Sequence, residues 1–405
     1  EAKAEHSGST VASADAAAAG AKVAAGAALA LNFVNDITTA TTARNITATE
    51  GGVGFSALSY ANSSATANAS ASGAPASKDG GKEDNAESQV NKQLEVDDSK
   101  NSAANKEGVK GQLKTGDGNI SIAAGLALNL VNSKANASLS DGLVINAAGQ
   151  FKLASTNETD AAAIASGSAV GNNPDVPPAK IGVGVGVALN IVNTENKASI
   201  GAATVTAQGI DLSAKMADPA LGGDGFSNFK AEATAGAGAS NVGIAGAVAL
   251  NLVGTNSSTA AIASNAVIDG GGGDVSITAV NNTKSSTVAK AVVPANPDAA
   301  DAKVGVGVAF ALDKITNVAD ASIGDNVTLT NAGNLTLLAQ SNNSSDTKVT
   351  TGAAGDLSIS PSVALNIVSN DTLASIGKGG LLTVKSLEAK AEHSGSTVAS
   401  ADAAA

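Results

Sequence analysis

The chain contains no cysteine and no tryptophan, and its 405 residues include only 1 tyrosine, 6 phenylalanines, 1 methionine and 2 histidines. Without cysteine there is no disulfide framework, no thiolate metal site and no cysteine nucleophile. The scarcity of aromatic side chains also removes the usual filling of a compact enzyme core, because the hydrophobic fraction of 43% is mostly alanine and valine. We therefore predict one repetitive body over residues 1–405 rather than two or three compact domains.

Basic residues are also scarce. Arg44 is the single arginine, and 24 basic against 36 acidic residues give a formal net charge of −12. Binding to nucleic acid phosphates needs clustered lysine or arginine, so nucleic acid is excluded as the main partner. No stretch reaches the roughly 18 uninterrupted apolar residues of a membrane-spanning helix, so we expect no membrane insertion.

The chain repeats itself at its two ends. Residues Glu1 to Ala18 read EAKAEHSGSTVASADAAA, and residues Glu388 to Ala405 read the same, which gives a period of 387 residues. Such an identity indicates one period, plus a short overlap, of a longer and nearly exact tandem repeat. His6 and His393 are therefore one position seen twice.

A weaker repeat divides this period into six modules. Each has a segment such as VALNIVN around one anchor residue, and the anchors are Asn32, Asn129, Asn190, Asn251, Asp313 and Asn366. Their spacings are 97, 61, 61, 62 and 53 residues, and a further 53 residues lead to the next period's Asn32. Segments such as ASIG and TVTA follow the anchor, so each module reads as a small β unit.

The long spacing of 97 residues indicates an insertion within residues 72–117, where the sequence has mixed charge and little apolar pattern. We predict a polar insertion loop there. Shorter breaks rich in Pro and Asp, at Asn172 to Lys180 and Pro294 to Lys303, precede the equivalent strand in other modules. Insertions at one point of a repeat usually lie along one edge of a solenoid.

Hydrophobic alternation predicts an all-β fold. In IGVGVGVALNIV, Ile181 to Val192, the larger aliphatic residues share one face and Gly, Ala and Asn share the other, which is the period of a strand. We predict that the aliphatic face is a core face. Glycine weakens a strand unless space is needed, so we also predict another backbone packed closely on the small face, with KAEATAGAGA, Lys230 to Ala239, as its candidate.

The predicted architecture is a parallel β-solenoid (β-helix) rod of six tandem modules of about 53–62 residues. Three narrow coils of about 20 residues per module would make one period a rod near 90 Å long. The alternatives are one wide coil per module, which would stack the anchor asparagines into a hydrogen-bonded ladder, and an antiparallel hairpin array with turns such as Asn193 to Lys197.

The blocks GVGVGVALNIVN, ASIG, ATVTA and GIDLSA resemble those of the large repetitive bacterial exoproteins and adhesins of the filamentous-haemagglutinin-like type, over essentially the whole chain outside residues 72–117. The resemblance implies export, a place outside the cell or on the bacterial cell surface, and a role in attachment or surface structure. It carries no catalytic motif.

Three segments invite a chemical reading and are better explained structurally. DGGKEDN (Asp79 to Asn85) and DGGGGDVSI (Asp269 to Ile277) are acidic and glycine-rich, but neither iterates the pattern of a calcium β-roll, so turns are favoured. The GVGVGV run continues as a strand, whereas a phosphate-binding loop needs a helix after it. His6 and His393 have no ordered catalytic partner in the sequence. We predict no catalytic, cofactor or metal site.

Asn-x-Ser/Thr patterns recur along the chain, for example at Asn45, Asn62, Asn68, Asn136, Asn157, Asn326, Asn334 and Asn370. In a chain so rich in Asn, Ser and Thr these follow from composition.

We therefore expect a non-enzymatic structural or adhesive repeat of a giant secreted protein, forming a stiff extracellular rod or filament. Self-association end to end into filaments is predicted because a chain cut between periods exposes open strand edges. A host or neighbouring cell surface, or polysaccharide, is the candidate external partner. The alternative is a polysaccharide-active β-helix enzyme, which would need paired carboxylates about 5 to 10 Å apart.

Overall fold

The computed structural model describes residues 1–19, 23–72, 120–169, 179–217, 223–238, 241–294 and 303–405. The described residues form strands and turns without a helix, and all strand pairs are parallel. The predicted insertion, except Ser72, lies outside the described residues, as do most of the two shorter breaks.

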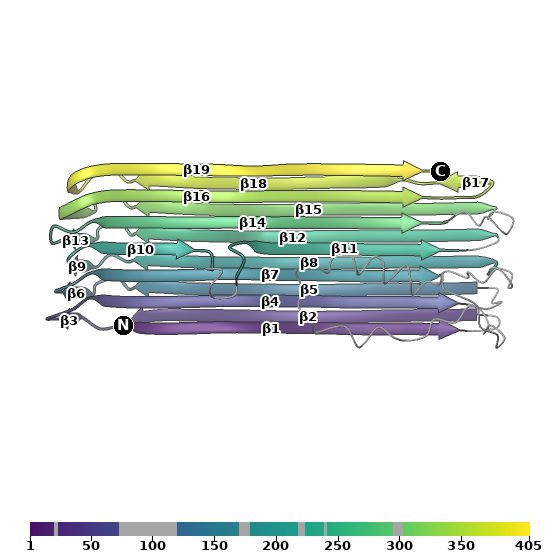
Figure 1. The fold of residues 1–405 in the computed structure, drawn as a ribbon, viewed down its shortest axis with the longest axis horizontal. Coiled ribbons are helices and arrows are strands. Elements are labelled where there is room, and N and C mark those ends of the chain that lie inside the picture. The colour runs from purple at the N-terminus through teal and green to yellow at the C-terminus, as the bar shows by residue number, and fades with distance from the viewer. Residues whose placement is uncertain (20–22, 73–119, 170–178, 218–222, 239–240, 295–302) are drawn as a thin grey trace.

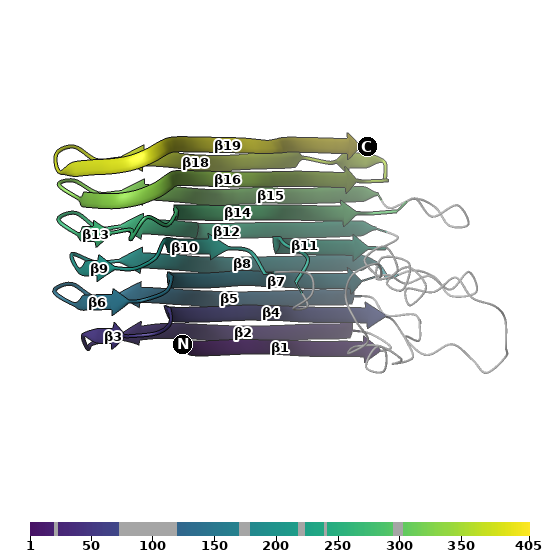
Figure 2. The same ribbon diagram turned by 60° about the vertical axis from the view of Figure 1, so that its left-hand side comes forward.

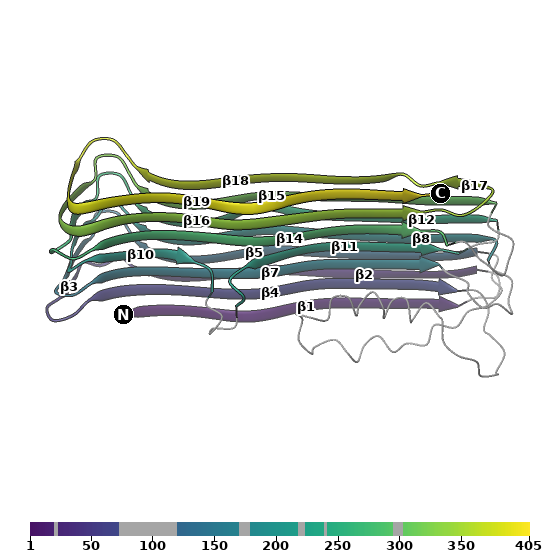
Figure 3. The ribbon, with the colours of Figure 1, turned by 45° about the horizontal axis from the view of Figure 1, so that its top comes forward.

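Two parallel sheets form the two layers of the molecule (Figures 1 and 3). Sheet A has twelve strands: β1 (Ala2–Ala19), β3 (Ile46–Ala48), β4 (Val53–Ser72), β6 (Val144–Ala147), β7 (Phe151–Ala169), β9 (Thr204–Thr206), β10 (Ile210–Lys215), β11 (Ser227–Ala237), β13 (Val267–Asp269), β14 (Val275–Val292), β16 (Thr328–Gly352) and β19 (Leu381–Ala404). Sheet B has seven: β2 (Val23–Thr42), β5 (Ile120–Leu139), β8 (Ile181–Ile200), β12 (Val242–Ile262), β15 (Val304–Ile323), β17 (Leu357–Ile359) and β18 (Ser362–Ile376).

Each module makes one wide coil. The chain follows a long strand of sheet B, turns at one edge through a short strand such as β6 or β9, returns along a long strand of sheet A, and crosses to sheet B at the other edge (Figure 2). The parallel β-solenoid is confirmed, and the coil is the wide one. Three narrow coils per module and the hairpin array are wrong, because Asn193 to Lys197 lies inside the continuous strand β8.

The wide coil changes the dimensions of the rod. Six coils at about 4.8 Å raise one period by about 29 Å, not 90 Å. A 20-residue strand such as β8 spans about 66 Å. One period is therefore a slab, broader than it is tall, with β1 and β19 at its opposite ends (Figure 1).

The turn that leaves sheet B recurs at a fixed place. The third residue after the strand has a positive φ in four coils, at Gly142, Asn265, Asn326 and Gly379. Glycine and asparagine are the residues that adopt this left-handed conformation at the lowest cost. The same turn thus returns the chain to sheet A at the same level of each coil.

The side chains inside the coil form ladders along the stacking direction. At the edge with the short strands the interior holds large apolar side chains and includes Phe151, Leu153, Ile200, Ile210 and Ile268, each 0% exposed. The opposite edge, where the break segments join the sheets, is filled almost entirely by alanine and glycine. We call these the wide edge and the thin edge.

The thin edge corrects the assignment of faces. In β8 the small residues Gly182, Gly184 and Gly186 point inward, and the aliphatic residues point outward, with Ile181 38% exposed. The predicted close approach is confirmed. A Cβ added to Gly184 would lie 2.1 Å from the carbonyl oxygen of Gly236 in β11, the strand that contains most of the predicted partner segment Lys230 to Ala239. The aliphatic face that alternation assigned to the core is the outer surface of sheet B.

Candidate functional site

Polar ladders cross the middle of the interior. Asn129 Nδ2 donates to Asn190 Oδ1 at 3.1 Å, Asn190 Nδ2 to Asn251 Oδ1 at 2.9 Å, and Asn251 Nδ2 to Asp313 Oδ1 at 3.2 Å. All four residues are 0% exposed. An amide that both donates and accepts along the axis suits a stack of identical coils. These four anchors of the sequence repeat therefore form a buried structural ladder, as the wide-coil alternative required.

Asp313 is the one carboxylate in this ladder. It accepts hydrogen bonds from Asn251 Nδ2 and from Ser345 Oγ. Burial raises the pKa of Asp313, while the hydrogen-bond donors around it oppose that change. Because those donors replace the missing amide, this coil keeps the stacking geometry of its neighbours.

The third coil, which begins with β8, differs from the others in sheet A. Its strand is split into β10 and β11, which both pair with β7 and β14. Lys215 ends opposite Thr156, and Phe229 resumes the pairing opposite Ala161, so residues 157–160 of β7 are not paired with either strand. Residues 216–217 and 223–226, the described residues between β10 and β11, are not part of a strand.

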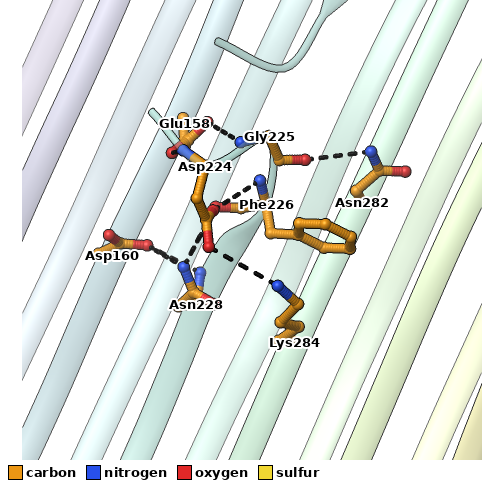
Figure 4. A network of polar contacts seen from close by, with 8 residues as sticks. All are labelled: Glu158, Asp160, Asp224, Gly225, Phe226, Asn228, Asn282 and Lys284. Atoms are coloured by element: carbon orange, nitrogen blue, oxygen red, sulfur yellow. Dashed lines mark hydrogen bonds and ion pairs between the residues drawn. The ribbon is translucent and has the colours of Figure 1, made fainter. Parts of the chain in front are cut away.

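Three carboxylates lie at this interruption, and we call Glu158, Asp160, Asp224 and Lys284 the acid clip (Figure 4). Glu158 accepts backbone hydrogen bonds from Asp224 at 2.7 Å and Gly225 at 3.1 Å. Asp160 Oδ1 accepts from the backbone nitrogen of Asn228 at 3.0 Å and from its side-chain Nδ2 at 2.8 Å. Both carboxylates of β7 therefore bind the segment that starts β11.

Lys284 of β14 closes the clip from the other side. Its Nζ lies 3.6 Å from Asp224 Oδ2 and 3.6 Å from the centre of the Phe226 ring. Asn282, also on β14, donates to the carbonyl oxygen of Gly225 at 3.0 Å. The segment is thus held from both neighbouring strands by charge-assisted hydrogen bonds and a cation–π contact.

Two acids of the clip, Glu158 and Asp160, have pKa values raised above their ordinary range. Burial, together with the nearby carboxylates of Asp160 and Asp224, raises the pKa of Glu158 to about 7. Burial raises the pKa of Asp160 to about 6, although its Asn228 donors and Lys284 act in the opposite direction. Acids with such values can exchange protons near neutral pH. Glu158, however, is 1% exposed, and both its carboxylate oxygens already accept backbone hydrogen bonds. We therefore assign it a structural role, which is to hold residues 224 and 225 against β7.

The segments considered in the sequence have structural places. Asp269 ends β13 and accepts from the nitrogen of Gly271 in the turn at 2.9 Å, while Asp274 accepts from the nitrogen of Asn334 at 2.8 Å. Asp79 to Asn85 lies outside the described residues. Within the described ranges, no group of three or more His, Asp or Glu is arranged to hold a metal ion. The GVGVGV run is the start of β8.

The two histidines lie on the end strands. His6 Nε2 is 3.3 Å from Asp36 Oδ1, and His393 Nδ1 is 2.7 Å from Ser341 Oγ. Among the Asn-x-Ser/Thr positions, Asn157 is 4% exposed and donates to the carbonyl oxygens of Ser133 and Glu195, so the folded chain does not present it for glycosylation.

The sequence analysis missed the acid clip. One signal was available: MADPALGGDGF, residues 216–226, interrupts an alternating strand pattern with Pro, Gly and Asp. Its neighbours Glu158 and Lys284 lie far away in the chain, and only the coil register brings them together.

No family model, curated protein or solved structure matched this chain. The part of the chain that the structure describes also contains no helix long and apolar enough to cross a membrane.

Proposed function

We propose that this chain is a structural repeat of a longer exported protein, in which stacked periods form a stiff extracellular ribbon for attachment or surface coating. The observation that carries the proposal is the equivalence of β1 and β19. The same 18 residues form the first and the last strand of sheet A, six coils apart. A following period would therefore continue both sheets without a change of register.

The interior supports stiffness. Every coil hydrogen-bonds to its neighbours along strands of up to 25 residues, and the anchor ladder ties the coils through side chains as well. Among the described residues, each coil packs against the coils directly before and after it, so the protein behaves as a one-dimensional stack of repeats. Each period adds only about 29 Å of height, so this architecture provides breadth and rigidity rather than reach.

The ends support continuation along the axis. β1 and β2 leave one edge each at the start of the stack, while β18 and β19 do so at its end (Figure 1). Open strand edges are templates for further pairing. End-to-end filaments, extracellular location and an adhesive role are parts of this proposal.

The 18-residue overlap predicts how such filaments form. In a continuous protein, the place above β16 belongs to the next period's first strand, and β19 already fills it with the same residues. A second copy of 1–405 would bring its own β1 to that place while its β2 joined β18. One of the two identical strands must then be displaced, whereas a chain of residues 1–387 meets its neighbour without duplication.

The test compares residues 1–405, residues 1–387 and a chain of two periods by electron microscopy and ultracentrifugation. We expect the two-period chain to be about 29 Å taller than one period with an unchanged cross-section. We also expect residues 1–387 to form longer filaments than residues 1–405 at equal concentration. A two-period chain that forms two separately tumbling bodies would contradict the ribbon, and monomeric 1–387 would contradict end-to-end assembly.

The polysaccharide-active alternative would need an open pair of carboxylates. Within the described residues, three carboxylates come together at the acid clip, and its Glu158 is covered and bonded to backbone. We therefore favour the structural role.

A further inference from the structure

The outer surface of sheet B is divided into an apolar half and a polar half. From each strand's start to just past its anchor, most outward side chains are aliphatic or aromatic, and the exceptions include Gly246 and Lys314. Beyond that point most of them are polar, as in the ion pair of Lys134 with Glu195 at 3.0 Å, although Ile37 and Leu373 also face outward. The apolar half, which we call the apolar face, includes Leu29, Leu31, Phe33, Ile122, Leu126, Leu128, Leu130, Val187, Leu189, Ile191, Val248, Leu250, Leu252, Val308, Phe310, Leu312, Val363, Leu365 and Ile367.

These side chains stand in ranks along the stacking direction. Leu31, Leu128, Leu189, Leu250, Leu312 and Leu365 are all in register, so one rank is leucine in all six coils. The surface is open to solvent in places, with Phe33 61%, Leu29 55% and Val363 50% exposed. A monomeric protein rarely leaves so continuous an apolar patch uncovered.

The size of the face fits a stable protein interface. Six strands spaced at about 4.8 Å, with about eleven residues of each strand at about 3.3 Å, give a footprint of roughly 1,000 Å². A standard interface buries about 800 Å² on each partner. The strands run alongside one another with little twist (Figures 1 and 2), so two such faces can meet over their full area.

Charge favours a second copy as the occupant. The whole chain carries −12, which opposes contact between two copies over most surfaces. The apolar face carries no acidic residue among its ranks, and its one charged side chain is Lys314, between Leu252 and Ile367. The polar insertion within residues 72–117 offers no apolar pattern that would match these ranks.

We propose that two copies of this chain pack face to face through the apolar face, so that ribbons pair laterally. The contact is isologous, with the same ranks on both sides, and it resembles the inner layer of a β-sandwich. Because the ranks continue from coil to coil, each added period extends the contact, and paired ribbons gain strength with length. This pairing is independent of end-to-end growth, which uses the strand edges instead.

The test places a charged pair in the centre of the face. Leu189→Lys with Leu250→Glu substitutes two outward residues that are aligned in adjacent strands, so the pair imitates the existing Lys134–Glu195 contact and preserves the coil. The control, Ser199→Lys with Ala261→Glu, makes the same pair in the same two strands on the polar half. Circular dichroism and thermal melting establish that both variants fold.

Lateral pairing is read from ribbon width by electron microscopy and from mass by sedimentation velocity. We expect double-width particles for the unmodified chain and the control, and a midpoint concentration for pairing raised at least about tenfold in L189K/L250E. Filament length should not change, which separates this result from a failure of end-to-end assembly. Equal widths for all three proteins, or single-width particles that float with phosphatidylcholine vesicles through this face, would overturn the proposal.

Discussion

The wide edge and the thin edge close the same two sheets with opposite choices of side chain. At the wide edge, ranks such as Ile145, Val205, Ile268 and Leu329 fill a broad interior. At the thin edge, alanine and glycine allow the sheets to approach until backbone meets backbone. The difference shows that bulk does not identify the inside of a strand: in β8 the smaller residues are buried and the larger ones face out.

The contrast is sharpest when one carbon is changed at each edge. Gly184→Ala adds a Cβ that would lie 2.1 Å from the Gly236 carbonyl oxygen and 2.6 Å from that of Gly167, and neither backbone can move without shifting a strand. We expect a loss of about 4 kcal/mol in the free energy of unfolding, measured by chemical denaturation, because overpacking at backbone contacts has no side chain to relieve it.

Ile268→Val removes one carbon from the wide edge and is the matched control. Ile268 is fully buried among flexible aliphatic neighbours, so we expect a loss of about 1 kcal/mol. A second control, Gly246→Ala, adds a Cβ with no atom within 4 Å and should leave stability almost unchanged. If Gly184→Ala costs no more than Ile268→Val, the thin edge is not closely packed.

The anchor ladder lies between the two edges and tests whether amides can replace apolar filling. Asn190→Ala leaves Asn129 Nδ2, the Ala161 carbonyl oxygen and Asn251 Oδ1 without their present partner. We expect a loss of about 2 to 3 kcal/mol in the free energy of unfolding, since buried polar groups without partners are costly. Asn132→Ala, which breaks the exposed pair with Asn35 on the outer surface, should cost less than about 1 kcal/mol. Equal losses would contradict a structural role of burial in the ladder.

Much of this fold could be predicted from the sequence because the repeat constrains it. The anchor spacing gave the modules, and the glycines of β8 gave the close approach to β11. The coil width could not be decided, since narrow and wide coils share the same alternation. The outward direction of Ile181 and its neighbours was also missed, because alternation separates two faces without saying which is buried.

The acid clip could not be predicted from the sequence for a related reason. Its parts come from β7, from the start of β11 and the residues just before it, and from β14, and they meet at the break between β10 and β11 in sheet A. Neither Glu158 nor Lys284 stands in a motif. Such a contact follows from register, and register was the part of the fold left open.

The last contrast is between the neutral amides of the ladder and the partly buried carboxylates of the clip. The pKa of Asp160 rises from 3.8 to about 6 on folding, chiefly through burial, so the folded protein holds this proton more tightly than the unfolded chain does. Its contribution to stability is therefore fully present below about pH 4 and is lost as the pH rises through about 6. Asp160→Asn keeps Oδ1 as the acceptor for both Asn228 donors and removes the charge. We expect unchanged stability at pH 4 and a gain of about 1 to 2 kcal/mol in the free energy of unfolding at pH 7.5, measured by denaturation at both values.

Asp211→Asn, on the same outer surface and paired with Lys152 at 3.3 Å, is the control and should show no such gain. A gain of equal size in both variants would mean that general charge repulsion, and not burial in the clip, sets the pH dependence, because a chain of net charge −12 is relieved by the loss of any carboxylate.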